Sequence, residues 1–106
     1  MERLAQALTR LHATVEARRG GDPKTSYTAQ LLADPARAAK KLGEEAVEAA
    51  IAAAQKDAPA LTAEAADVFY HLVVLLAAAG VDADAVAAEL ERREGRSGVE
   101  EKASRG

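Results

Sequence analysis

Residues 68–79 read VFYHLVVLLAAA, a segment that is apolar around almost its whole helical circumference. A helix with this pattern is typically buried on every side of a folded protein. Alanine, the strongest helix former, accounts for 28 of the 106 residues, whereas the aromatic residues that favour strands make up only 3%. The segment and the composition together predict an all-α fold and argue against a β-sandwich or barrel.

The other helices are marked by apolar spacing and by capping residues. A first helix should stop at Gly20-Gly21, and its apolar face is formed by Leu4, Leu8, Leu11 and Val15. Later helices are expected from near residue 27 and over 36–55, 60–79 and 83–94. Residues 56–59, which end in Pro59, are expected to form a break between the two long helices. Their expected caps are Ser26 or Thr25, Asp34, Asp82 and, at a C-terminus, Gly80. The predicted fold is a bundle of four to five helices forming one domain over residues 1–95, followed by a polar, flexible tail at 96–106.

Composition limits the partners of this domain. Leu, Ile, Val and Phe together come to only 21 residues, so one chain buries a thin core and a homodimer is expected. The absence of cysteine excludes disulfides, a thiolate nucleophile and a zinc finger. A net charge of −3 without a basic stripe predicts no nucleic-acid partner. No uninterrupted apolar run reaches the roughly 20 residues of a membrane span, and no secretory signal is present, so a cytoplasmic protein is expected.

Acidic residues stand at the borders of apolar surfaces on both long helices. One stripe on the first of these helices carries Lys41, Glu44, Glu45 and Glu48. A stripe on the next helix, which leads into the buried segment, carries Glu64, Asp67 and His71. If the two helices pack antiparallel, the stripes face each other and like charges converge. Oxygen ligands of this kind suit Mg²⁺, with Mn²⁺ as an alternative.

Each of these residues also has an ordinary structural interpretation. Acids spaced three apart are common on the exposed surfaces of helices, and the spacing of Lys40 and Lys41 allows them to pair with Glu44 and Glu45. His71 is expected to be a core histidine rather than a metal ligand, because oxygen-rich Mg²⁺ sites seldom use imidazole.

Several runs of sequence resemble known families. Glu44-Glu45-x-x-Glu48 followed by Glu64-x-x-Asp67 resembles the metal motif of the all-α nucleotide pyrophosphohydrolases, the MazG-like superfamily. Residues 26–28 (SYT), 40–46 (KKLGEEA) and 64–72 (EAADVFYHL) resemble the phosphoribosyl-ATP pyrophosphatase family in order and spacing. The likeness extends from the first helix to the end of the last.

The resemblance implies an activity and roles for the acids. It implies Mg²⁺-dependent hydrolysis of the α–β phosphoanhydride of phosphoribosyl-ATP to phosphoribosyl-AMP and pyrophosphate, the second step of histidine biosynthesis. The implied metal ligands are Glu45, Glu48, Glu64 and Asp67. Glu44 is implied as a further ligand or as the base that orients water, which makes Glu44, Glu45 and Glu48 the catalytic group. Candidate phosphate contacts are Lys41, Lys24, Ser26 and Thr28.

Two alternatives to this activity stay open at this point. One keeps the chemistry and changes the substrate, as in a house-cleaning pyrophosphohydrolase acting on non-standard or deoxynucleoside triphosphates. The other is a non-catalytic helical dimerisation module whose acids bind a partner.

Overall fold

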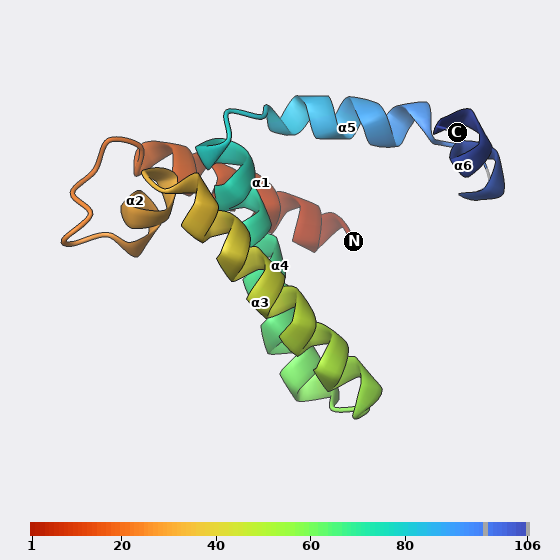
Figure 1. Cartoon of the computed structure of the whole chain (residues 1–106), viewed down its shortest axis with the longest axis horizontal. Coiled ribbons are helices and arrows are strands. Elements are labelled where there is room, and N and C mark those ends of the chain that lie inside the picture. The colour runs from red at the N-terminus through yellow and green to blue at the C-terminus, as the bar shows by residue number, and fades with distance from the viewer. Residues whose placement is uncertain (97, 106) are drawn as a thin grey trace.

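The computed structural model describes residues 1–96 and 98–105, and every element in it is a helix (Figure 1). The helices are α1 (Glu2–Ala17), α2 (Tyr27–Leu32), α3 (Pro35–Ala54), α4 (Ala58–Ala78), α5 (Ala83–Arg92) and α6 (Gly98–Arg105). The all-α prediction is confirmed. The tail predicted at 96–106 contains α6, while Ser97 and Gly106 lie outside the described residues, and the flexibility of this tail stays a prediction.

Side-chain caps start the helices where the sequence predicted, with one exception. The side chains of Ser26, Asp34 and Asp82 accept hydrogen bonds from the first-turn amides of α2, α3 and α5. The exception is α4, which begins two residues earlier than expected because Asp57 caps the amide of Ala60. A proline in the first turn of a helix lacks only an amide proton that would be unpaired there anyway. The prolyl residue at 59 is therefore part of α4 and not a break before it.

The two long helices form an antiparallel hairpin around which the rest of the fold is arranged (Figure 1). Between them, Lys56 adopts a left-handed φ of 56°, and the amide of Asp57 bonds back to the carbonyl of Ala52. α1 and α2 pack on α4 at the other end of the hairpin. The buried core lies at that end and consists of Val15, Leu31, Ala38, Val74 and Ala77. The hairpin therefore has a core end made of four helices and a turn end made of two.

α4 is less enclosed than its sequence predicts. Only His71, Val74 and Ala77 are fully buried in it, and Leu72 is 39% exposed. By length and mean hydropathy (1.5) α4 could also cross a membrane, but it carries Glu64 and packs against α1, α2 and α3 as the central helix of the bundle. The expectation of burial on every side is wrong for the single chain, because α5 leaves the body of the molecule and does not cover α4 (Figure 1).

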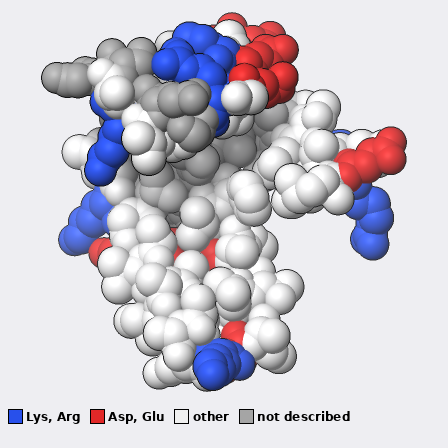
Figure 2. Space-filling model, turned by 90° about the vertical axis from the view of Figure 1, so that its right-hand side faces the viewer, with Lys and Arg blue, Asp and Glu red and all other residues white. Residues whose placement is uncertain are grey.

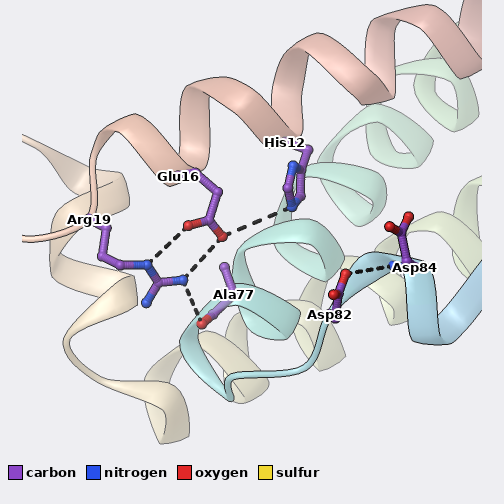
Figure 3. Close-up of polar contacts among 6 residues, drawn as sticks. All are labelled: His12, Glu16, Arg19, Ala77, Asp82 and Asp84. Carbon is purple, nitrogen blue, oxygen red and sulfur yellow. Dashed lines mark hydrogen bonds and ion pairs between the residues drawn. The ribbon is translucent and has the colours of Figure 1, made fainter.

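α5, one face of α1 and the C-terminal end of α4 surround an open cleft of about 950 Å³. Its walls are mostly apolar, and no residue of α5 is buried. At its edge, the guanidinium of Arg19 donates to both carboxylate oxygens of Glu16 and, at 3.0 Å, to the carbonyl oxygen of Ala77 near the C-terminus of α4 (Figure 3). Arg19 also lowers the pKa of Glu16 below its usual value. Arg19 thus ties α1 to α4 where the helix dipole of α4 favours a cation.

Candidate metal centre

Two acids of α3 and one acid of α4 meet across the hairpin. Carboxylate oxygens of Glu45, Glu48 and Glu64 all lie within 4.8 Å of one another. Glu48 and Glu64 are equally far from Lys56 along the chain, so the antiparallel packing of α3 and α4 places them opposite each other. We refer to these three residues as the acidic cluster. The two predicted stripes do face each other at these positions.

The acidic cluster is partly shielded from solvent. Glu45 and Glu64 are half-buried, and Glu48 is exposed. In Figure 2 the lower part of the molecule, which is the turn end of the hairpin, shows small acidic patches recessed among uncharged side chains. The Oε2 atoms of Glu45 and Glu64 are buried and have no hydrogen-bond partner among the described residues.

The close approach of these carboxylates changes their protonation. The neighbouring Glu45 carboxylate, burial and the nearby Glu48 carboxylate together raise the pKa of Glu64 to about 7. A proton is one way to relieve like charges that cannot be separated, and a cation is the other. Buried carboxylate oxygens without donors are ligands that a hard divalent cation would accept. The residues present therefore fit a Mg²⁺ or Mn²⁺ ion.

Two of the predicted acids lie outside the acidic cluster. The Glu44 carboxylate is 44% exposed and pairs with the Lys41 ammonium at 3.4 Å, since the residue next to Glu45 points about 100° away around α3. Asp67 is exposed, and its carboxylate is not part of the group within 4.8 Å. The pairing of Lys41 with an acid of its own helix agrees with the structural interpretation of that lysine, although the partner is three residues away.

Comparison with known proteins identifies the family. The model of the phosphoribosyl-ATP pyrophosphohydrolase family matches residues 8–94. The chain belongs to this family. It is 64% identical to the phosphoribosyl-ATP pyrophosphatase of Caulobacter vibrioides, over 98% of this chain and 97% of that protein. It is 66% identical to the protein of the same name from Methylobacterium radiotolerans over 95% of each chain, and 60% identical to that of Rhodobacter capsulatus over 94% of this chain and 98% of the relative.

The family match confirms the resemblance on which the sequence prediction rested. It runs from α1 into the residues after α5 and includes every acid of the acidic cluster. The chain is therefore an enzyme of an all-α pyrophosphohydrolase family, consistent with the MazG-like superfamily. The chain covers 97% of the Caulobacter vibrioides relative and 95% of the Methylobacterium radiotolerans relative.

In this member of the family, the predicted phosphate contacts of the loop lie around the start of α2. The Ser26 hydroxyl caps α2 by accepting from the amide of Ala29 at 3.1 Å. The Thr28 hydroxyl forms a hydrogen bond with the Tyr70 hydroxyl of α4. Lys24 is exposed, and its backbone amide donates to the side chain of Asp22. Both hydroxyls are thus engaged within the fold, and a role for any of the three in binding stays a prediction.

Sequence reasoning missed the contacts made by Tyr27 and Arg37. The Tyr27 ring stacks on Tyr70 with centroids 6.5 Å apart, and the Arg37 guanidinium carbon lies 5.9 Å from the Tyr27 centroid. The available signals were weak: Tyr27 sits inside the SYT run, and Arg37 lies one helical turn before Lys41. His71 is buried with both ring nitrogens in contact with polar atoms, as expected of a core histidine.

Proposed function

We propose that this chain hydrolyses the α–β phosphoanhydride of phosphoribosyl-ATP, releasing pyrophosphate and phosphoribosyl-AMP, and that it requires Mg²⁺. The observation that carries the proposal is the acidic cluster, in which Glu45 and Glu64 each have a buried carboxylate oxygen without a donor. The relatives that share this sequence are named phosphoribosyl-ATP pyrophosphatases. The reaction would be the second step of histidine biosynthesis.

The metal would be held by the acidic cluster, with Asp67 one turn further along α4 as a fourth ligand. Mg²⁺ held by these carboxylates would supply positive charge for the phosphates and a water of lowered pKa. The protein's own contribution is to hold the carboxylates close together and oriented. Glu44, which is exposed beside the acidic cluster, is the further ligand or the base that orients the attacking water. Mn²⁺ would satisfy the same oxygen ligands.

Cationic and hydroxyl side chains would hold the phosphates. Lys41 lies one turn before Glu45 on α3, a rise of about 6 Å, so a polyphosphate bound at the acidic cluster comes within its reach. Its ammonium is balanced only partly by Glu44, because both side chains are open to solvent. The other proposed contacts are Lys24 and Ser26, from the loop before α2, and Thr28, in the first turn of α2.

Pyrophosphate release tests the proposal. Purified protein is incubated with phosphoribosyl-ATP, with and without Mg²⁺, and with a panel of deoxynucleoside and non-standard nucleoside triphosphates. We expect release from phosphoribosyl-ATP only when Mg²⁺ is present. Faster turnover of a triphosphate on the panel would assign the house-cleaning activity instead. A folded protein that neither turns over any of these nucleotides nor binds Mg²⁺ would be a helical scaffold.

The thin core supports the proposal that the enzyme is a homodimer. Among the described residues, the largest side chains that are fully buried are Leu31, Val15 and Val74. Val47 and Ile51, one turn apart on α3, are 60% and 51% exposed. A second copy that covers such a face would complete the bundle. Light scattering should give twice the 11.0 kDa of one chain, and a mass of 11.0 kDa at micromolar concentration would contradict the dimer. A cytoplasmic location also remains part of the proposal.

A further inference from the structure

Hydrogen bonds and ring contacts between side chains hold α2 against α4. The Thr28 hydroxyl bonds to the Tyr70 hydroxyl, and the Tyr27 hydroxyl lies 3.4 Å from His71 Nε2. The Tyr27 and Tyr70 rings stack with an interplanar angle of 15°, and the Tyr70 ring stands at 90° to that of His71 with centroids 5.0 Å apart. We call Tyr27, Thr28, Tyr70 and His71 the aromatic clasp.

The hydrogen bonds of the aromatic clasp run in a defined direction. His71 Nδ1 lies 2.8 Å from the backbone carbonyl oxygen of Asp67, which only accepts, so Nδ1 carries the ring proton. Nε2 then accepts from the Tyr27 hydroxyl. With only 6% of its surface exposed, His71 joins α2 to the turn of α4 that follows Glu64.

A second set of contacts links the loop before α2 to α2 and α3. The Gln30 amide nitrogen donates to the carbonyl oxygen of Pro23 at 2.7 Å, and its amide oxygen accepts from Arg37 of α3 at 3.2 Å. The Arg37 guanidinium in turn lies against the Tyr27 ring. The residue after Pro23 is Lys24. The position of this lysine relative to α3 and α4 therefore depends on contacts that converge on Tyr27.

α2 would hold this position poorly without such contacts. It is only six residues long, and helices of this length are not stable on their own in water. Its buried residues are Ala29 and Leu31, which lie beyond its first residues. The aromatic clasp acts at the first two residues of α2, directly after the loop.

We propose that Tyr70 and His71 are positioning residues that hold the loop at 18–26, with Lys24, in place for the phosphates of the substrate. The proposal rests on the proposed function for the identity of that substrate. Neither side chain touches the acidic cluster in the described contacts, so loss of the aromatic clasp should weaken substrate binding and leave metal binding intact. It should also free the loop to exchange its amide hydrogens.

Isosteric deletion of single hydroxyls tests this role. Tyr70→Phe and Thr28→Val each remove one side of the same hydrogen bond, and Thr28→Ser restores it. Each deletion should raise KM for phosphoribosyl-ATP roughly tenfold, the effect of losing about one hydrogen bond, with kcat within about twofold of wild type. The double variant should be no worse than either single variant, because both remove one interaction. Thr14→Val deletes a hydroxyl that bonds only within α1 and serves as the matched control.

Separate readouts keep the two proposals distinguishable. Mg²⁺ affinity from calorimetry should be unchanged in Tyr70→Phe, and hydrogen exchange over residues 18–26 should become faster. Unchanged hydrogen exchange over residues 18–26 in a folded Tyr70→Phe variant would overturn the proposed positioning role, whatever the activity of the variant. A loss confined to kcat would also overturn it, as would additive effects in the double variant, because these would show that Thr28 acts independently of Tyr70. If wild-type protein leaves phosphoribosyl-ATP intact, the proposed function fails, and hydrogen exchange still decides whether the aromatic clasp holds the loop.

Discussion

The two ends of the α3–α4 hairpin differ in what holds them together. At the core end, four helices bury Leu31, Val15 and Val74, and no acid belongs to the core cluster. At the turn end α3 and α4 pack on each other, the side chains between them include three carboxylates, and Ile51 is left 51% exposed. The buried core and the proposed metal site are therefore separated along one pair of helices. Repelling charges are tolerated at the turn end because the core end supplies the packing.

The largest difference in stability between the two ends is expected from a substitution of Leu31. Its side chain is completely buried, and Leu31→Ala should lower the free energy of unfolding by about 3 kcal/mol, through lost burial and the cavity left behind. Leu61→Ala at the turn end removes a side chain that is 36% exposed and should cost less than about 1 kcal/mol. Urea denaturation measures both. Equal losses would show that the two ends contribute alike.

A substitution of Glu48 is expected to reduce activity without reducing stability. Glu48→Gln removes a proposed metal ligand together with a repelling charge, so activity should fall at least about a hundredfold while stability in the absence of metal is unchanged or higher. Pyrophosphate release and urea denaturation measure the two effects. Glu91→Gln, on α5, is the control and should change neither. Marked unfolding of the Glu48→Gln variant would assign the acid to structure and not to catalysis.

The raised pKa of Glu64 predicts a pH dependence of stability and metal binding at the turn end. Its pKa in the fold is raised from 4.5 to about 7, so its stabilising contribution in the metal-free protein is full below pH 4.5 and is lost as pH rises through 7. A divalent ion must displace that proton. Apparent Mg²⁺ affinity should therefore rise by up to about tenfold per pH unit below pH 7 and level off above it, as seen by calorimetry.

A control variant connects this pH dependence to the acidic cluster. Glu64→Gln has no proton to release at this position and should bind Mg²⁺ weakly, with little dependence on pH between 6 and 8. A wild-type affinity that does not change over the same range would show that the metal binds away from Glu64.

The smallest expected effect lies at the turn itself. Lys56 adopts a left-handed φ of 56°, whereas the equivalent turn after α4 uses Gly80 at 71°. An L-residue other than glycine is strained in this conformation by about 1–2 kcal/mol, so Lys56→Gly should stabilise the protein by about 1 kcal/mol. Gln55→Gly, at a right-handed φ of −82°, should destabilise it instead. Melting temperatures of the two variants test the sign of each effect.

Local features of the molecule follow from the sequence alone. The capping residues Ser26, Asp34 and Asp82 were predictable, because a cap acts within three residues of itself. The convergence of Glu48 with Glu64 also followed from helical spacing and a short connection, since antiparallel helices place residues equidistant from the turn opposite each other. The early start of α4 was missed because the prolyl residue at 59 was interpreted as a break when it is a first-turn residue.

Tertiary structure decided which side chains enter the site and which elements close the fold. Asp67 and Glu44 lie on the predicted stripes but outside the acidic cluster, because the rotation of each helix about its axis is set by packing at the core end. The contact between Tyr27 and His71 spans 44 residues and depends on where α2 docks. The departure of α5 leaves α4 more exposed than its apolar sequence predicts. Helix caps and apolar periodicity depend on residues that are close in sequence, so the sequence determines them. Which side chains meet between two helices depends on how all the helices pack together.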